Sequence, residues 1–369
     1  MRKFLAIVST CIVALFLFSC AENNNATFKG EIANLDVPYI LASHLSADTL
    51  AIDTIKTKTG KFKYTANVDT LTAFTFYFND FNSSAVAFAD KNQKIVIEGD
   101  AHLPDLIQIT GNEINNDLSN FKTENEPLLK ERAELFNNIK LDAQNNTNNG
   151  MLAENDKIAR INSLNHDLIQ KAEDYIKKNP AKIASVILIN DFFKTSENPQ
   201  ALERVLSYLD GDAAETSLKA QLTAYSNRLK LSAEGAGMPY FRLIDTKKDT
   251  LTSNDFKGKY LVLSFLSATG EESRQDVKTL KKVYAQLNKD SVKFISVYID
   301  SDIYPITTIE NDSIPWAAVP EKKSWASDIV SAYNIRYVPY NILISPNSII
   351  GNRNIPAQEI EQMIKNNTK

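Results

Sequence analysis

The residues best placed for chemistry in this 369-residue chain lie at 269–274, where the sequence reads TGEESR. An apolar run at 260–266, typical of a buried strand, precedes them, and an amphipathic run at 271–287, typical of a helix, follows. The first turn of a helix carries partial positive charge, and a cysteine placed there would become a reactive thiolate. This stretch contains no cysteine, so the sequence predicts a positioned junction without a thiol.

Other chemistry at this junction has weak support in the residues. Ser273 would need a positioned base to act as a nucleophile, and the three histidines all lie before residue 233. Glu271, Glu272 and Asp276 supply carboxylates, but one helical turn offers fewer oxygens than the roughly six to eight that Ca²⁺ takes. We therefore expect no catalytic residue, no metal and no cofactor.

A structural interpretation of the same residues is a helix cap. Thr269, with Glu272 three residues later, matches the capping-box pattern, in which each side chain accepts a hydrogen bond from the other residue's backbone N–H. Glu271 and Glu272 also place negative charge at the positive end of the helix dipole, typically stabilising by about 0.3–1 kcal/mol each. This pattern predicts that Thr269 is the N-cap residue.

The N-terminus is predicted to be a targeting segment rather than part of the fold. Arg2 and Lys3 precede an apolar run at 4–18, which is short for a membrane-spanning helix and fits the core of a signal peptide. The run ends in LFSC at 17–20, which resembles the lipobox of bacterial lipoproteins. An ordinary secretory signal and an uncleaved anchor are the alternatives.

The lipobox resemblance implies a signal peptide at 1–19, lipid attachment at Cys20 and a short tether at 20–26. Cys11, the other cysteine of the chain, would leave with the signal peptide, so the mature chain would hold no free thiol. Two or more acyl chains anchor a protein stably to a membrane. We therefore expect the cell envelope as the location, with the outer membrane favoured and the protein facing the periplasm or the cell surface.

Residue patterns divide the rest of the chain into three regions. Residues 27–111 contain short β-branched and aromatic runs between Asn, Asp and Gly turns, which predicts a small antiparallel sandwich or barrel. Residues 112–232 carry apolar residues at three- and four-residue spacing, which predicts helices. Residues 233–369 alternate strands with helices, which predicts an α/β domain. The net charge of −4 argues against nucleic-acid binding, which requires a basic surface.

Four motifs in the third region occur in an order that is similar to thioredoxin-like domains of the membrane-anchored TlpA/ResA type. They are MPYFRL at 238–243, DFKGKYLVLSF at 255–265, FISVYID at 294–300 and YNIRYVP at 333–339. The resemblance implies a thioredoxin-like fold for most of this region. It also implies that Val338 and Pro339 correspond to the segment that carries the family's cis-proline.

The run FLSATGEESR at 265–274 departs from the family pattern F-W-A-x-W-C-x-x-C-R. Gly270 stands at the position of the attacking cysteine, Ser273 stands at that of the resolving cysteine, and Glu271 and Glu272 lie between them. Thiol–disulfide exchange requires a thiolate, so the redox role is not carried over. Asp276 matches a carboxylate that often follows in this group.

The resemblance instead predicts a peptide- or protein-binding groove, lined by Thr269, Asp276, Val338 and Pro339. A backbone segment before the proline would pair there with an extended peptide. Two alternatives stay open. The chain could assist thiol–disulfide exchange by holding a substrate for a cysteine-bearing partner, or the first two regions could carry the function. Trp316 and Trp325 belong either to the core or to the groove.

The first two regions resemble the N-terminal part of many Bacteroidetes lipoproteins, in which a β domain of the DUF4369 type precedes a helical linker. The matching signature is IDTI at 52–55 followed by GKF at 60–62. This resemblance implies no activity.

Overall fold

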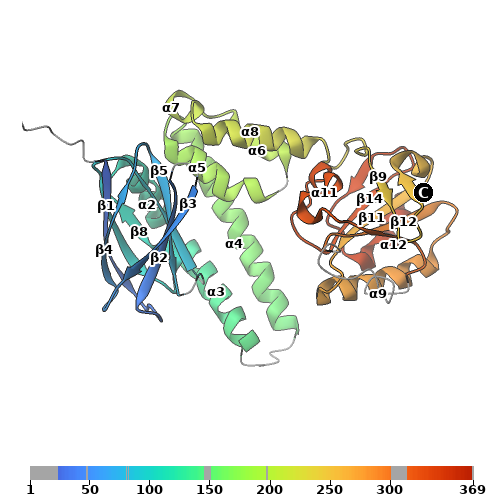
Figure 1. The fold of residues 1–369 in the computed structure, drawn as a ribbon, viewed down its shortest axis with the longest axis horizontal. Helices are drawn as coiled ribbons and strands as arrows, with labels where there is room; N and C mark the ends of the chain where they lie inside the picture. Colours follow the sequence, from blue (N-terminus) through green and yellow to red (C-terminus); the bar gives the residue numbers. More distant parts are fainter. Residues whose placement is uncertain are drawn as a thin grey trace, which may run out of the picture. The chain divides into compact units, whose positions relative to one another are not determined.

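The computed structural model describes residues 24–46, 49–79, 81, 83–144, 151–196, 198–300 and 314–367 (Figure 1). The predicted signal peptide and Cys20 lie outside these residues. The chain forms two compact units: an N-terminal unit, which extends to Leu188 and includes 208–214, and a C-terminal unit of 189–207 and 215–369. The region predicted to be helical, 112–232, is thereby divided between the two units. No helix among the described residues has the length and apolarity needed to cross a membrane.

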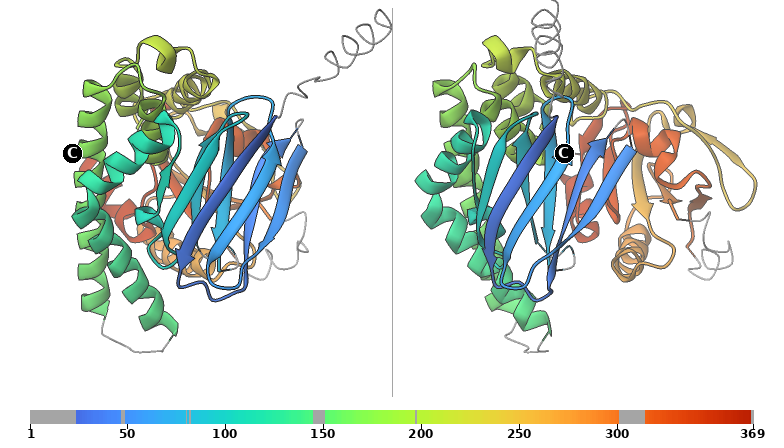
Figure 2. Two further views of the ribbon diagram at one scale, coloured as in Figure 1. Left: turned by 90° about the vertical axis from the view of Figure 1, so that its left-hand side faces the viewer. Right: turned by 60° about the vertical axis from the view of Figure 1, so that its left-hand side comes forward.

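The N-terminal unit begins with a β sandwich of two four-stranded sheets, drawn in blue in Figure 2. One sheet has the order β4-β1-β7-β8 and the other the order β3-β2-β5-β6. Between them lies a core of aromatic and aliphatic side chains in which Phe28 packs on Phe74 and Phe76, with ring centroids 4.6 and 5.2 Å away. The strands are β1 (Asn25–Ala33), β2 (Tyr39–Ser46), β3 (Thr49–Lys56), β4 (Lys61–Asn67), β5 (Thr72–Phe78), β6 (Ser83–Ala89), β7 (Lys94–Asp100) and β8 (Gln108–Thr110).

The strands follow the alternation of the sequence, because every second side chain points into the core. Along β5, Phe74, Phe76 and Phe78 are buried, and the residues between them are partly or fully exposed. One pairing differs from the antiparallel arrangement that the pattern predicted: β1 and β7 run parallel. Alternation along a strand does not encode the direction of its neighbour, and five strands separate β1 from β7 in the sequence, which leaves room for the long connection that a parallel pair needs.

Helices follow the sandwich in the same unit. The longest of them, α4, buries most of the apolar stripe that the three- and four-residue spacing predicted, namely Ile161, Leu164, Leu168, Ala172 and Ile176. Ile158, the first residue of that predicted stripe, is exposed, and the helix ends at Lys178, before Asn179-Pro180. The other helices that lie wholly in this unit are α2 (Glu113–Glu124), α3 (Glu126–Gln144) and α7 (Gly211–Ala214), with α4 at Met151–Lys178 and the short η1 at Pro104–Leu106. Helix α5 (Ile183–Phe192) begins in this unit and ends in the other.

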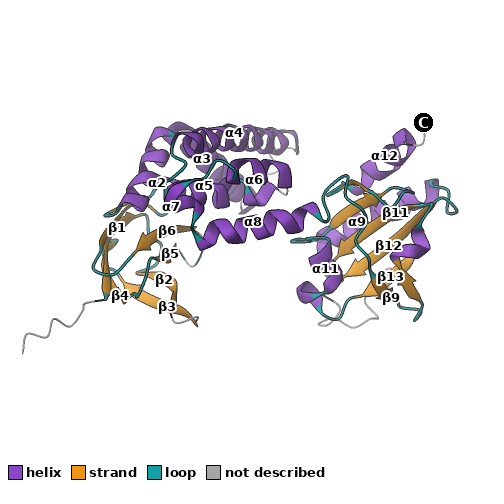
Figure 3. Cartoon of the chain, turned by 90° about the horizontal axis from the view of Figure 1, so that it is seen from above, coloured by secondary structure: helices purple, strands orange, loops and turns teal. Residues whose placement is uncertain are grey.

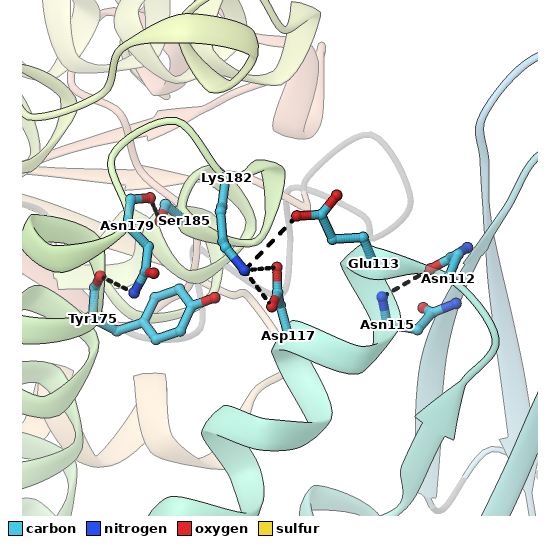
Figure 4. Close-up of polar contacts among 8 residues, drawn as sticks. All are labelled: Asn112, Glu113, Asn115, Asp117, Tyr175, Asn179, Lys182 and Ser185. Carbon is cyan, nitrogen blue, oxygen red and sulfur yellow. Dashed lines mark hydrogen bonds and ion pairs between the residues drawn. The ribbon is translucent and has the colours of Figure 1, made fainter.

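A polar clamp joins α2 to the segment that leads into α5 (Figure 4). Lys182 Nζ lies 2.7 and 3.0 Å from the two carboxylate oxygens of Asp117 and 3.8 Å from a carboxylate oxygen of Glu113. The Asp117 carboxylate raises the pKa of Lys182 above its usual range through its hydrogen bond. The ring of Tyr175 lies beside Asp117, and burial raises the pKa of this phenol. Lys182 therefore pairs with the mostly buried carboxylate of Asp117, so that this buried charge has an opposite charge beside it.

The C-terminal unit is built on a five-stranded sheet with the order β13-β12-β11-β14-β15, of which Figure 3 labels β11, β12 and β13. Strand β11 pairs with β12 in parallel and with β14 antiparallel. The five strands are β11 (Tyr260–Leu266), β12 (Val292–Tyr298), β13 (Ala317–Pro320), β14 (Tyr340–Ile344) and β15 (Ile350–Asn352), and a separate hairpin is formed by β9 (Arg242–Ile244) and β10 (Thr250–Thr252).

Apolar side chains cover both faces of this sheet. One face packs against α11 and the β9–β10 hairpin through Leu243, Ile329 and Tyr333, and the other packs against α9 and α12 through Leu280, Val283 and Ile360. Strand β11 is buried along its whole length, as expected of a central strand covered on both faces. The helices are α9 (Glu271–Gln286), α11 (Asp328–Ala332) and α12 (Ile360–Asn367), with short 3₁₀ turns η3 (Ser253–Phe256), η4 (Ser324–Ala326) and η5 (Ala357–Glu359).

Helix α8 (Ser217–Lys230) also belongs to the C-terminal unit, together with α6 (Pro199–Leu206) and η2 (Lys194–Ser196). Asn334 donates from Nδ2 to Arg228 O at 3.1 Å and to Ser232 Oγ at 2.8 Å. Arg336 places its guanidinium over the ring of Tyr225, 4.5 Å from the centroid. These contacts hold the end of α8 against the segment that leads into β14.

Candidate functional site

The predicted junction lies where β11 ends at Leu266 and α9 begins at Glu271. The N-cap residue of α9 is Gly270, which has extended backbone angles and makes no side-chain cap. The predicted capping box of Thr269 and Glu272 is therefore wrong. Its failure has a physical cause: the backbone N–H groups of Thr269 and Gly270 both donate to Ser267 Oγ, at 3.2 and 2.9 Å. Ser267 supplies the acceptor from the loop, one turn before the helix.

Ser267 is the centre of a hydrogen-bond network that fixes this loop. Its Oγ donates to Asp300 Oδ2 at 2.6 Å while accepting from the two loop amides. The other carboxylate oxygen of Asp300 accepts from the N–H of Ala268 at 2.7 Å. Hydrogen bonds to a charged carboxylate are stronger than neutral ones. The loop that precedes α9 is thus held from within the domain by five hydrogen bonds that involve Ser267 or Asp300, one of them between Ser267 and Ser273.

Ser273, which the resemblance predicts to stand at the position of the resolving cysteine, is buried and takes part in the same network. Its Oγ accepts from the backbone N–H of Ser267 at 2.9 Å. Gly270, which the resemblance predicts to stand at the position of the attacking cysteine, has little room beside it for a side chain. A Cβ placed there would lie 3.1 Å from Ser267 Cβ and 3.8 Å from Ser273 Oγ. The described residues contain no cysteine, and positions 270 and 273 hold a glycine and a hydrogen-bonded serine.

Glu271 lies exposed at the first position of α9. The pKa of its carboxyl is held below the usual range by the hydrogen bond from Gln275 and then by Arg274, whose Nη2 lies 2.9 Å away. The positive end of the helix dipole acts in the same direction. Glu271 is therefore a charged surface group paired within its own helix. Glu272, its neighbour, is exposed, and its side chain makes no hydrogen bond among the described residues.

Asp276 lies one and a half turns into α9 and faces the sheet. Asn341, on β14, donates from Nδ2 to Asp276 Oδ2 at 2.8 Å and to Ile355 O at 3.1 Å. Burial raises the pKa of Asp276 above its usual range, and the hydrogen bond from Asn341 opposes this shift. Asn341 Oδ1 is buried without a partner among the described residues. The two influences on Asp276 thus oppose each other, because burial disfavours the charged carboxylate and the hydrogen bond donated by Asn341 stabilises it.

Val338 and Pro339 lie at the same end of the sheet as the junction. Strands β11 and β14 are antiparallel with Phe265 opposite Tyr340, so the residues just after β11 meet the residues just before β14. The Val338–Pro339 peptide bond is cis. Val338 forms no hydrogen bond among the described residues, and Arg336 and Tyr337 before it are exposed. The four residues of the predicted groove are thus brought to one region, with Asp276 linked to β14 through Asn341.

Sequence reasoning missed the role of Ser267 and Asp300. Ser267 directly follows the end of β11, and Asp300 lies two residues after the end of β12. These two strands are adjacent and parallel, and their last residues, Leu266 and Tyr298, lie opposite each other. Polar side chains at the carboxyl ends of neighbouring parallel strands meet at one edge of a sheet. That signal was present in the sequence. Of the two tryptophans, Trp316 is buried and donates to Ser296 Oγ at 2.9 Å, whereas Trp325 is about half exposed.

Comparison with protein-family models agrees with this geometry. Residues 235–353 match the AhpC/TSA family, and residues 26–118 match DUF4369, a domain of unknown function. The chain carries a DUF4369 domain and a thioredoxin-like domain of the AhpC/TSA family. No curated protein matches it.

Several solved structures from Bacteroides are similar to parts of this chain. The thioredoxin domain of a thiol-disulfide oxidoreductase from Bacteroides vulgatus is 25% identical, with a TM-score of 0.34, over 37% of this chain and 99% of that one. A thiol:disulfide interchange protein from Bacteroides sp. is 26% identical, with a TM-score of 0.33, over 36% and 89%. A thioredoxin-like protein from Bacteroides caccae is 15% identical, with a TM-score of 0.43, over 59% and 86%.

Proposed function

We propose that this protein is a lipid-anchored envelope protein whose thioredoxin-like domain binds an extended peptide segment and performs no thiol–disulfide exchange. The observation that carries the proposal is the pair of residues at the former cysteine positions. Exchange begins with a thiolate that attacks a disulfide sulfur. Gly270 offers no side chain, and Ser273 Oγ is engaged by the N–H of Ser267. On this proposal the domain keeps the thioredoxin-like fold but lacks the two thiols that thiol–disulfide exchange requires.

Binding is supported by the backbone of Val338. Its N–H and carbonyl groups make no hydrogen bond among the described residues, and it lies beside the loop after β11. A backbone segment with open hydrogen-bonding groups can pair with an extended chain, as at the edge of a sheet. Exposed side chains of Arg336 and Tyr337 flank this segment. Peptide main chain is therefore the chemistry that this site would recognise.

Redox inactivity is tested by insulin reduction with dithiothreitol. The expected rate for the wild-type protein equals that of the blank without protein, and turnover above the blank would overturn the proposal. A matched gain-of-function variant, Gly270→Cys with Ser273→Cys, restores both thiols. The new Cβ at 270 would crowd Ser267 at 3.1–3.2 Å, so Ser267→Ala is added to relieve the contact. A disulfide requires Cβ atoms about 3.5–4.5 Å apart, so reaction of the variant with a thiol reagent before and after oxidation establishes whether the two new thiols pair.

Peptide binding is tested with an extended chain that lacks thiols, such as reduced and alkylated α-lactalbumin. We expect saturable binding that is weakened by Val338→Pro, which removes the open N–H donor, and retained by Val338→Ala, which keeps it. Equal binding by the two folded variants would refute the assignment of this segment. Lipid attachment is tested separately by mass spectrometry of the N-terminal peptide, which should carry acyl chains on Cys20 and lose them in Cys20→Ser.

A second candidate function is assistance to a cysteine-bearing partner in thiol–disulfide exchange. The observation that favours it is the match of residues 235–353 to a family of redox proteins. In this case the site would hold the substrate while the partner supplies the thiolate. Crosslinking in intact cells from a photoreactive residue at Tyr337 distinguishes the two functions. Recovery of an oxidoreductase supports the second candidate, and recovery of other proteins alone counts against it.

A further inference from the structure

The chain enters the β sandwich at one end, which we call the entry end. Strand β1 starts there at Asn25, opposite Asn67 at the end of β4, and the N–H of Val68 donates to Asn24 O at 2.8 Å. The connection at 68–71 then leads into β5, so the first residue of β5, Thr72, lies at the same end. The turn at 90–93 is also there, because the N–H of Asn92 donates to Asn25 O at 3.1 Å.

The β2–β3 hairpin closes at the entry end as well. Ser43 on β2 lies opposite Thr75 on β5, and the two strands are antiparallel. Moving along β2 beyond Ser43 therefore leads toward the beginning of β5. Leu45 lies there, paired with Leu50 on β3. The sheet topology thus gathers the start of β1, the start of β5 and the β2–β3 hairpin at one end of the sandwich.

Large aliphatic side chains are exposed at this end. Leu45 is 66% exposed, Leu50 60%, Ile52 55% and Leu71 41%, and together we call them the apolar rim. They do not belong to the core, because the neighbouring β2 residues Ile40 and Ala42 point the other way and are fully buried. A single exposed leucine is ordinary, but a group of them at one end of a domain marks a contact surface.

We propose that the apolar rim inserts into the boundary between the headgroups and acyl chains of the membrane that anchors the protein. The inference rests on the proposed lipid attachment at Cys20. Four residue steps separate Cys20 from Asn24, and a fully extended chain spans at most about 14 Å over four steps. The headgroup region of one leaflet is roughly 5–8 Å thick. A lipid on Cys20 therefore keeps the entry end within reach of the membrane surface.

The charges at the entry end indicate how the contact is made. Asp69, Asp90, Lys91 and Lys94 lie on the connecting segments and the start of β7, so both signs are present in equal number among these residues. An interfacial contact that depended on anionic lipids would need an excess of Lys and Arg. The rim is therefore expected to insert by apolar contact and to do so in vesicles of neutral phosphatidylcholine.

The test uses the full lipidated protein, reconstituted in phosphatidylcholine vesicles, with one reporter at a time. Leu50→Cys carries an environment-sensitive nitrobenzoxadiazole label, and Thr54→Cys is the matched control. Both residues are exposed on β3 and point to the same side of the sheet, but Thr54 lies farther from the entry end. Leu71→Cys provides a second position on the rim, and circular dichroism verifies that each variant is folded.

The inference predicts a blue shift of the label at 50 and at 71 on reconstitution, with loss of emission when nitroxide-labelled phospholipids are present. The label at 54 should show neither effect. An anchored protein whose labels at 50 and 71 stay in water would overturn this inference and leave the anchoring intact. A blue shift without quenching by lipid nitroxides would also overturn it, because it indicates a second copy or another protein on the rim. Absence of acyl chains on Cys20 would overturn both proposals.

Discussion

Replacing Ser267 by alanine is the most direct test of the network that fixes the degenerate junction. The hydroxyl donates to Asp300 at 2.6 Å and accepts from the N–H groups of Thr269 and Gly270 at 3.2 and 2.9 Å. A hydrogen bond to a charged group contributes about 1.5–3 kcal/mol, and a neutral one contributes about 0.5–1.5 kcal/mol. Thr269 and Gly270 are half-buried, so water replaces part of what their amides lose.

The expected loss of unfolding free energy in Ser267→Ala is therefore about 2–4 kcal/mol. For a unit of this size, each kcal/mol lowers the melting temperature by about 2–4 °C, which gives about 4–16 °C in total. Two assays test this expectation: the thermal unfolding transition of the C-terminal unit, and the hydrogen-exchange rates of the backbone amides of Thr269 and Gly270. Exchange at these two amides should become faster than at amides within β11, because the loop loses its acceptor while the strand keeps its ladder.

Two controls make this result specific. Ser331→Ala removes a hydroxyl from an exposed position in the same unit and should change stability by less than about 0.5 kcal/mol. A double-mutant cycle with Asp300→Ala should be non-additive, because both changes remove the same hydrogen bond. The reasoning is refuted if Ser267→Ala is as stable as the wild type and the two loop amides exchange at unchanged rates.

Three further predictions concern buried polar groups. Burial raises the folded pKa of Asp276 above its usual 3.8, so the neutral acid contributes stability that is fully present below pH 3.8 and is lost as pH rises through the folded pKa. Asp276→Asn should therefore be more stable than the wild type at neutral pH, and the unfolding free energy of the wild type should fall by no more than about 1.4 kcal/mol per pH unit. Equal pH profiles of the two proteins would contradict this prediction. Lys182→Met leaves the mostly buried Asp117 unpaired and should lower the unfolding free energy of the N-terminal unit by about 1–3 kcal/mol, as measured by urea unfolding. Lys178→Met makes the same change in charge at an exposed position and should lower it little. Trp316→Phe removes the donor to Ser296 and should destabilise the C-terminal unit by about 1–3 kcal/mol, while Trp325→Phe should be neutral; equal thermal unfolding of the two variants would disprove the buried role of Trp316.

Local patterns in the sequence predicted the elements around the junction closely. The apolar run at 260–266 is β11, and the amphipathic run after it is α9, which ends at Gln286. The burial of both elements explains this agreement: a central strand covered on both faces is apolar throughout, and a surface helix repeats its apolar residues every three to four positions. The stripe of α4, with its end before Asn179-Pro180, was predictable for the same reason.

Pairings between distant residues were not predictable in this way. The sequence allows Thr269 and Glu272 to form a capping box, and only the approach of Ser267 to the loop amides decides against it. The parallel pairing of β1 with β7 is likewise invisible to alternation, which is the same for either direction. A helix cap competes with whatever acceptor the fold brings to the same N–H groups, and the local sequence does not reveal that competitor.

The sequence alone determined that positions 270 and 273 carry no thiol, because residue types are covalent facts that no fold can alter. It also determined the elements, because burial on one face or on both imprints a period on the chain. Tertiary structure decided which groups surround these two positions. Ser267, Ser273 and Asp300 meet because β11 and β12 lie side by side in parallel and α9 turns back over the sheet. The same holds for the apolar rim, whose members are spread over 45–71 and meet only where three strands of the sandwich reach one end.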